Sequence, residues 1–139
     1  MTLAIQNPTK MGIRSDPAGD GHYLAKRGTR LHAGIDFLCE PGQPVYSPIA
    51  GYVTRHAYPY TNDYHFRGIV IQGSWCRIKL LYVIPKLYFG IIVSAGEIIA
   101  TAQDISSKYP NQGMLPHVHC EFEEIVPNPE FFLEGINHV

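Results

Sequence analysis

The sequence predicts a mainly β fold with little helix, built on an antiparallel β-sheet core. Thirteen glycines and eleven prolines are spread along the 139 residues, which is typical of many short strands joined by tight turns. Several segments are short apolar runs or alternate between apolar and polar residues, as strands do. Because 45% of the residues are apolar, one hydrophobic core can form, and we expect a single domain over residues 1–139.

The expected elements are short and follow one another along the whole chain. Residues 1–20 are expected to form an irregular N-terminal arm, since Asn7-Pro8 and Asp16-Pro17 are turn signals. Strands are expected at residues 37–38, 44–48, 50–54, 69–71, 77–84, 96–99 and 117–124. We expect long loops over 58–67 and 104–115, and a short closing helix over 128–133.

The charge pattern excludes two classes of partner. Eleven basic and twelve acidic residues give a formal charge of −1, and no basic run occurs, so nucleic acid and anionic membrane surfaces are not expected partners. The most apolar window, residues 78–100, is interrupted by charged residues, glycine and proline, so it cannot serve as a membrane span of about 20 residues. This window is typical of paired strands.

The N-terminal ten residues contain one short apolar run, Leu3-Ala4-Ile5, far less than the ~7–15 apolar residues of a secretory signal. We therefore expect no signal peptide in this chain. Its localisation stays open, because earlier processing, delivery by a phage tail and release by lysis each fit.

Three cysteines, Cys39, Cys76 and Cys120, cannot all pair within one chain, and no C-x-x-C motif occurs. A disulfide framework is therefore not expected, and a single bond stays open. Cys120 directly follows His119, so on a strand its sulfur points to the opposite face, and we expect it in the core.

The most informative pattern consists of two clusters, His32-Ala33-Gly34-Ile35-Asp36 and His117-Val118-His119. On a straight strand, rising about 3.3 Å per residue, His32 and Asp36 would lie ~13 Å apart. They can share one ion only if the backbone bends, and Gly34 bends without a Cβ penalty. His117 and His119 face the same side of a strand, so one can bind the ion and the other can stand over it. Such ligands suit Zn²⁺, and three of them leave one coordination position free for water.

The pattern H-x-G-x-D followed by H-x-H resembles that of the lysostaphin-type (LytM-like) zinc metallopeptidases, which cut peptide bonds in bacterial peptidoglycan. Residues 21–27, 32–39, 44–48 and 50–51 also follow one another as in that family, and the likeness extends over about residues 20–125. It is greatest to the leukocyte cell-derived chemotaxin-2 branch, which binds zinc without known proteolysis.

The resemblance implies a lysostaphin-type fold in which long loops form a groove with a metal ion at its floor. It implies that His32, Asp36 and His119 bind Zn²⁺ and that His117 stands beside the open position as base or oxyanion donor. Glu121 shares a strand face with His119, and we expect it to hold a ligand imidazole in its tautomer.

The loop over 58–67 supplies the candidate groove residues, Tyr58, Tyr60 and His65. Aromatic side chains there can stack on glycan or peptide. The expected partner is a peptidoglycan peptide or glycopeptide, and the oligomeric state stays open.

One segment departs from the active members of the family. They carry a second catalytic histidine in a Y-x-H-L segment, and the matching residues here are Tyr82-Val83-Ile84-Pro85. Isoleucine neither donates nor accepts a proton, and the loss of one donor at a developing oxyanion lowers the rate by ~10²–10³. We expect Tyr82 to point away from the face of residue 84 and not to take over the missing role.

Two functions follow from these residues. The first is zinc-dependent hydrolysis of peptide bonds in peptidoglycan, with weak activity because Ile84 replaces the second histidine; the complete ligand triad and His117 favour it. The second is a non-catalytic zinc-binding protein that recognises a glycopeptide or protein partner through the same groove, for which Ile84 is the best support. A metal-free structural module is a third, weaker alternative.

Overall fold

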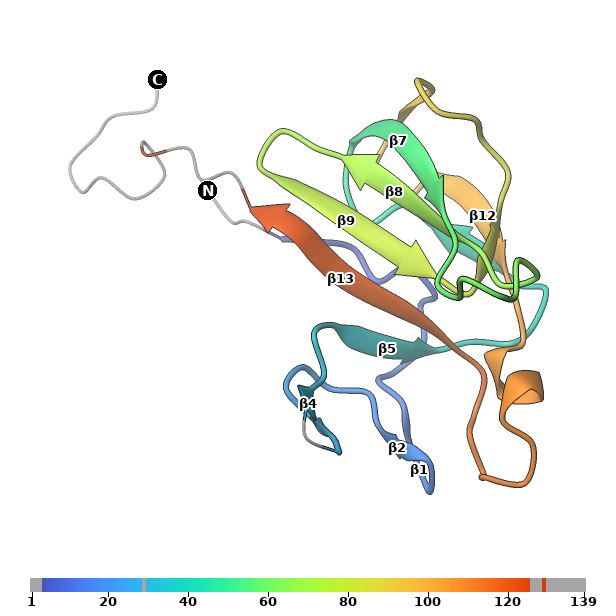
Figure 1. Ribbon diagram of the computed structural model, residues 1–139. Helices are drawn as coiled ribbons and strands as arrows, with labels where there is room; N and C mark the ends of the chain where they lie inside the picture. Colours follow the sequence, from blue (N-terminus) through green and yellow to red (C-terminus); the bar gives the residue numbers. More distant parts are fainter. Residues whose placement is uncertain (1–3, 29, 126–128, 130–139) are drawn as a thin grey trace.

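The computed structural model describes residues 4–28, 30–125 and 129 of the chain (Figure 1). Over residues 4–28 and 30–125 it consists of short β-strands, loops and one turn of 3-10 helix. The strands are β1 (Ser15–Asp16), β2 (Gly19–Asp20), β3 (Lys26–Arg27), β4 (Arg30–Leu31), β5 (Ile35–Leu38), β6 (Pro44–Tyr46), β7 (Gly51–Ala57), β8 (Gly68–Gln72), β9 (Cys76–Leu81), β10 (Val83–Pro85), β11 (Ile92–Val93), β12 (Ile98–Ala102) and β13 (His117–Ile125), with the 3-10 turn η1 (Ile105–Lys108) between β12 and β13.

The strands form one large sheet, one small sheet and two hairpins. The six-stranded sheet has the order β11-β7-β8-β9-β13-β5, and the three-stranded sheet has the order β10-β12-β6. The hairpins are β1-β2 and β3-β4. Neighbouring strands in the described part pair antiparallel throughout, so the predicted mainly β, antiparallel fold is confirmed. No helix in that part is long and apolar enough to cross a membrane.

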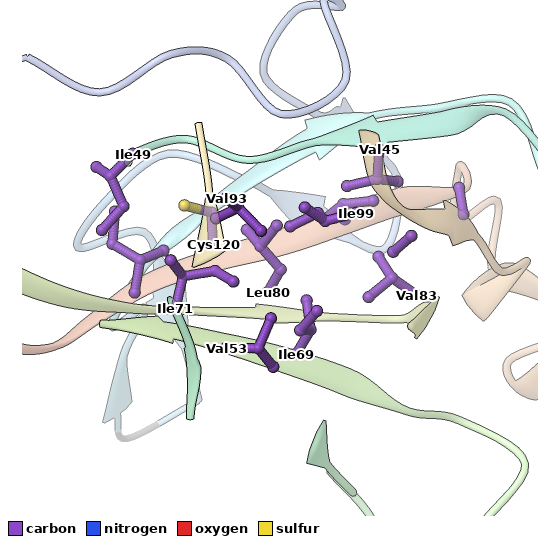
Figure 2. Packing of buried hydrophobic residues seen from close by; sticks show 14 of the residues in the cluster. Val45, Ile49, Val53, Ile69, Ile71, Leu80, Val83, Val93, Ile99 and Cys120 are labelled. Carbon is purple, nitrogen blue, oxygen red and sulfur yellow. The ribbon is translucent and has the colours of Figure 1, made fainter. Parts of the chain in front are cut away.

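The hydrophobic core lies between the six-stranded and the three-stranded sheet (Figure 2). Its members come from both sheets: Val53, Ile69, Ile71, Leu80 and Cys120 from the larger, and Val45, Val83 and Ile99 from the smaller. Burial of one such aliphatic side chain contributes roughly 1.5–3 kcal/mol. The three cysteines are buried and free, and Cys120 lies in the core as expected.

Alternation along β13 separates this core from a second, polar face of the large sheet. Val118 and Cys120 are at most 5% exposed and belong to the core cluster. Successive strand residues point to opposite faces, so His117, His119 and Glu121 lie on the other face. The strand that builds the core therefore also presents the second histidine cluster.

The strand expected over residues 77–84 is in fact two strands that belong to different sheets. β9 runs in the six-stranded sheet and β10 in the three-stranded sheet, and Tyr82 joins them. Tyr82 has a φ of 69°, in the left-handed region that a bulky side chain rarely adopts. An apolar run carries no signal for such a break, which is why the sequence predicts one continuous strand.

The loop predictions agree with the structure in most places. Residues 58–67 contain no strand, and residues 104–115 contain only η1, which the Asp104 side chain caps by accepting from the Ser106 backbone N–H at 3.1 Å. The described part of the predicted arm, residues 4–20, is irregular apart from β1, β2 and one bridge between Ile13 and Phe37. The closing helix expected over 128–133 lies, except for Pro129, outside the described residues.

Gly34 is required for a different reason from the one that the sequence suggests. The chain bends there, but its φ is not in the left-handed region. A Cβ atom at this position would lie 2.4 Å from the Cys120 carbonyl oxygen and 2.9 Å from His119 Cε1. Gly34 therefore allows the segment before β5 to approach the backbone of β13.

We predict that Gly34→Ala lowers the free energy of unfolding by ~1–3 kcal/mol, because the added methyl group overlaps with the backbone of β13. Urea unfolding of the metal-free protein measures this change. Gly12→Ala is the matched control, since a Cβ atom there meets nothing within 4 Å and Gly12 has no positive φ. Equal stabilities of the two variants would contradict the close approach.

Candidate metal centre

Three strand segments bring His32, Asp36 and His119 together. Asp36 on β5 is the direct cross-strand partner of His119 on β13, and such pairs have Cβ atoms about 4.5–5.5 Å apart. His32 follows β4, where its N–H donates to the Ala25 carbonyl at 2.8 Å and its carbonyl accepts from the Leu24 N–H at 2.9 Å. All three residues are at most 9% exposed.

The three side chains form a small triangle of possible ligand atoms. His32 Nε2 lies 3.2 Å from Asp36 Oδ1, His119 Nδ1 lies 3.0 Å from the same oxygen, and the two nitrogens lie 3.1 Å apart. Two ligands of a tetrahedral Zn²⁺ ion, with bonds of about 2.0–2.1 Å, lie about 3.3–3.4 Å apart. The triangle therefore has the size that one tetrahedral ion needs, and the three residues form a candidate metal site.

The outer nitrogens of both imidazoles contact groups that can only accept a hydrogen bond. His32 Nδ1 lies 3.0 Å from the His22 carbonyl oxygen, and His119 Nε2 lies 2.9 Å from Glu121 Oε1. In the neutral tautomers these outer nitrogens carry the hydrogens, so both inner nitrogens present lone pairs to Asp36 Oδ1. Three lone pairs about 3 Å apart repel one another unless a cation, either a metal ion or a proton, lies among them.

When no metal ion is bound, His119 is the group whose surroundings favour a proton. Burial alone lowers the pKa of His119, but hydrogen bonds with Asp36 and Glu121 raise it more, so the net pKa lies above the ordinary value of 6.5. When no metal ion is present, Asp36 therefore favours the protonated form of His119, with a hydrogen on Nδ1. A metal ion at the centre must displace that proton.

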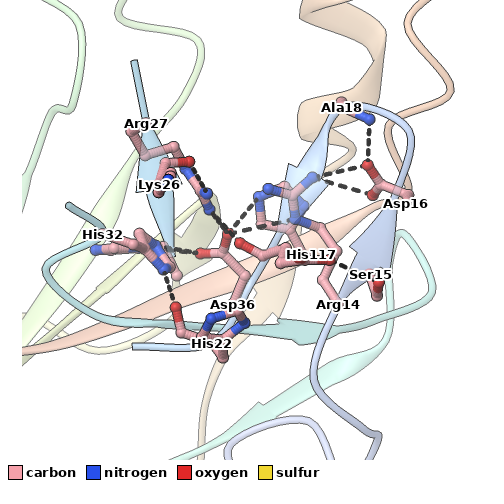
Figure 3. A network of polar contacts seen from close by, with 12 residues as sticks. Arg14, Ser15, Asp16, Ala18, His22, Lys26, Arg27, His32, Asp36 and His117 are labelled. Atoms are coloured by element: carbon pink, nitrogen blue, oxygen red, sulfur yellow. Dashed lines mark hydrogen bonds and ion pairs between the residues drawn. The ribbon is translucent and has the colours of Figure 1, made fainter. Parts of the chain in front are cut away.

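The second oxygen of Asp36 is held by two arginines (Figure 3). Arg14 Nε lies 3.3 Å and Arg27 Nη2 lies 3.4 Å from Asp36 Oδ2. Arg14 is itself buried and held by both oxygens of Asp16 at 3.0 Å. Asp36 Oδ1 is therefore left to face the histidines, which favours a single oxygen ligand over a bidentate carboxylate.

His117 stands beside the triangle without belonging to it. Its Nδ1 donates to the Leu115 carbonyl at 2.8 Å, so the neutral ring presents the lone pair of Nε2 toward Asp36 Oδ2, 3.7 Å away (Figure 3). Burial lowers the pKa of His117, although Asp36 raises it in part. A neutral imidazole with a free nitrogen beside the ligands is suited to accept a proton.

A pocket of about 330 Å³ opens over these histidines, and tyrosines form one of its walls. Tyr60, Tyr82 and Tyr109 line it together with His117 and the three candidate ligands. The ring of Tyr82 meets that of His117 edge-on, with centroids 5.6 Å apart, and the hydroxyls of Tyr60 and Tyr109 lie 2.8 Å apart. A larger, mainly apolar depression of about 660 Å³ along β13 contains neither His117 nor any of the three candidate ligands.

Of the other candidate residues, some line this pocket and others do not. Tyr60 is in its wall, and Tyr58 lines adjoining depressions with Tyr60. His65 is exposed, packs edge-on against Phe66, and does not line the pocket. Ile84 is 43% exposed on β10 and is also absent from the pocket lining.

Arg14 and Tyr109 line the pocket although the sequence did not mark them, and Tyr82 lines it too. Tyr82 points away from the face of Ile84, as expected, but Tyr82 faces the pocket and Ile84 lies outside it, because the positive φ of Tyr82 interrupts the strand. Arg14 lies in the arm expected to be irregular, and no motif marks it. Arg14 can be recognised only in the folded structure. The bridge between Ile13 and Phe37 brings it next to Asp36, and the two side chains form an ion pair.

Comparison with known proteins connects this geometry to a family. No family model matches the chain. Leukocyte cell-derived chemotaxin-2 from Bos taurus is 36% identical over 107 residues, which cover 76% of this chain and 69% of the relative. Myeloid protein 1 from Gallus gallus is 30% identical over 119 residues, which cover 83% of this chain and 36% of that protein.

Solved structures share the fold at lower sequence identity. The catalytic domain of the antimicrobial peptidase lysostaphin from Staphylococcus simulans has a TM-score of 0.53 and 20% identity, with 87% of this chain and 92% of that chain covered. A zinc containing peptidase from Vibrio cholerae has a TM-score of 0.59 and 24% identity, with 89% of this chain and 41% of that chain covered. The expected lysostaphin-type fold is confirmed, and the chain belongs to the leukocyte cell-derived chemotaxin-2 family.

Proposed function

We propose that this domain binds one Zn²⁺ ion through His32 Nε2, Asp36 Oδ1 and His119 Nδ1. The observation that carries the proposal is the triangle of these three atoms, 3.0–3.2 Å apart, with the outer imidazole nitrogens engaged by acceptors. In this proposal Glu121 holds the His119 imidazole in the tautomer that a metal needs. The zinc containing peptidase from Vibrio cholerae, which shares the fold, is consistent with this choice of ion.

We further propose that the domain hydrolyses peptide bonds, with a peptidoglycan peptide or glycopeptide as the substrate. A bound zinc ion would polarise a carbonyl and acidify a water molecule. His117 Nε2 accepts the proton of the attacking water and returns it to the leaving amine when the C–N bond breaks. The support is the neutral, buried His117 beside the open side of the ligand triangle and the peptidase fold.

The second candidate is a zinc-binding protein without catalysis that recognises a peptide or glycopeptide partner in the same pocket. Two observations favour it. The chain belongs to the chemotaxin-2 family, and Ile84 stands where active lysostaphin-type enzymes carry a histidine. The zinc site is common to both candidates, so only an activity measurement separates them.

We predict one zinc ion per chain after purification with added zinc, measured by elemental analysis. His32→Ala and Asp36→Ala each remove one of three ligands, so we expect both to lose the stoichiometric ion. His22→Ala is the matched control, because only the His22 backbone carbonyl contacts the site and its side chain is exposed. Full zinc content in the Asp36→Ala protein would refute the ligand assignment.

Zinc binding is predicted to depend on pH in a defined direction. The pKa of His119 in the metal-free protein is raised, so its proton stabilises that state at low pH, and this contribution is lost as the pH rises through the raised pKa. Zinc must displace the same proton. The increase in Tm caused by zinc should therefore be larger well above pH 6.5 than below it, and calorimetry should detect proton release on binding.

A Tm increase that does not change with pH would show that His119 gives up no proton. In that case Nδ1 of His119 is not the ligand atom. Glu121→Gln tests the same point independently, because it removes one of the two carboxylates that raise the His119 pKa.

Hydrolysis is tested with purified cell-wall sacculi and the zinc-loaded protein, by counting newly released amino groups. We expect release above an EDTA control, and we expect His117→Ala to lower it at least ~10²-fold while the zinc content stays at one ion. No release above the control supports the second candidate. Loss of zinc in the His117→Ala protein would show that His117 is a ligand.

A further inference from the structure

The tyrosine wall of the pocket has no role in the zinc site, and one of its members is held in an unusual conformation. Tyr82 joins β9 to β10 with a φ of 69°. Such a conformation costs about 1–3 kcal/mol for a non-glycine residue and persists only where the surroundings impose it. It directs the Tyr82 side chain into the pocket, whereas Ile84, two residues later, is 43% exposed outside it.

Hydrogen bonds hold the backbone of Tyr82 in place on both sides. Its N–H donates to the Arg67 carbonyl at 2.8 Å, and its carbonyl accepts from the Gln103 N–H at 2.9 Å. The Gln103 side chain, which is buried, ties the same region together by accepting from the Arg67 N–H and donating to the His65 carbonyl. The position of the phenol is therefore fixed before any ligand binds.

The Tyr82 ring is also fixed from its sides. It packs edge-on against His117 at 5.6 Å and against Phe66 at 6.4 Å. Burial raises the pKa of Tyr82 to about 12, against the opposing effect of its hydrogen bonding with Tyr60. The hydroxyl therefore keeps its proton at neutral pH and can act as a donor.

Given the proposed hydrolysis, on which this inference rests, we propose that the Tyr82 hydroxyl is the hydrogen-bond donor to the developing oxyanion. It takes the role of the histidine that Ile84 replaces. The attacked carbonyl oxygen gains negative charge as the water oxygen bonds to the carbon, and Tyr82 stabilises that charge without losing its own proton. The water proton passes to His117 Nε2 and from there to the leaving amine.

The effect of a preorganised hydrogen-bond donor on the rate can be measured. Removal of one oxyanion donor lowers kcat by ~10²–10³. A donor that acts only on the charged, tetrahedral species affects kcat and leaves the binding of the uncharged peptide unchanged. A tyrosine that only closes the pocket would change both by similar factors.

Tyr82→Phe tests the inference, because it removes the hydroxyl and keeps the ring that packs against His117. Two probes are compared by calorimetry on the zinc-loaded protein: a capped Ala-Ala peptide, and its phosphinic analogue, whose charged tetrahedral group imitates the oxyanion. We expect the variant to bind the phosphinic analogue about 10- to 100-fold more weakly and the peptide with unchanged affinity. Release of amino groups from sacculi should fall ~10²–10³-fold at constant zinc content.

Tyr46→Phe is the matched control, since Tyr46 lies on β6 in the other sheet, and it should leave both affinities and the rate unchanged. A second variant, Tyr82→Phe combined with Ile84→His, tests the family position directly. Because Ile84 lies outside the pocket, we expect no recovery of phosphinic-analogue binding or of the rate. Recovery of either would overturn the assignment to Tyr82.

The binding measurement also separates the two proposals. If binding of the phosphinic analogue depends on the Tyr82 hydroxyl but the protein does not cleave sacculi, the proposed substrate is refuted and the donor assignment stands. Equal affinities of the native and Tyr82→Phe proteins for the analogue, or no binding of it by the native protein, would refute the donor assignment, whatever the rate on sacculi.

Discussion

The pairing register of β5 with β13 is the constraint on which the candidate centre depends. It places Asp36 directly opposite His119, and alternation along β13 places the core residue Cys120 on the far face. A shift of the register by one residue would turn every side chain of one strand to the other face, so the core and the centre would be lost together. The packing of the core thus maintains the geometry of the ligands, and Gly34 permits the approach that brings the turn after His32 against the same strand.

The charges around this register, some buried and some half-buried, form an ordered series. Asp16 holds Arg14, Arg14 and Arg27 hold one oxygen of Asp36, and the other oxygen of Asp36 faces the histidines. Beyond His119 the series continues through Glu121 to Lys79, 3.5 Å further on. Isolated buried charges are strongly unfavourable, whereas charges of alternating sign, each with hydrogen-bond partners, are tolerated. At the ligand triangle two imidazole nitrogens meet one carboxylate oxygen, so a cation there, either a proton or a metal ion, would continue the alternation of charge.

The sequence predicted what depends on local pattern and missed what depends on contacts between distant segments. The predicted strands at residues 69–71 and 117–124 lie in the large sheet, and strand periodicity places His117 and His119 on one face. The pairing of H-x-G-x-D with H-x-H as one ligand set came from the family resemblance. The bend at Gly34 was predicted and is present, but the close approach of β13, which excludes a Cβ atom there, was not visible in the sequence. The positions of Arg14 and Tyr82 likewise could not be predicted from the sequence. Arg14 reaches the centre from an arm without a motif, and Tyr82 lines the pocket through a backbone conformation that its residue type does not predict.

The ligand set by itself does not distinguish an enzyme from a binding protein, because both need the same three atoms to hold the ion. What distinguishes them is whether further side chains in the pocket can accept a proton from water and donate a hydrogen bond to the substrate. In the proposed hydrolysis one such group accepts a proton, since His117 Nε2 carries no hydrogen in the neutral ring, and one donates a hydrogen bond, since the phenol of Tyr82 keeps its proton. The break between β9 and β10 determines the second, for it turns residue 82 inward and residue 84 outward. Ile84 therefore takes no part in the pocket, and the chemistry of the pocket has to be inferred from the side chains that line it.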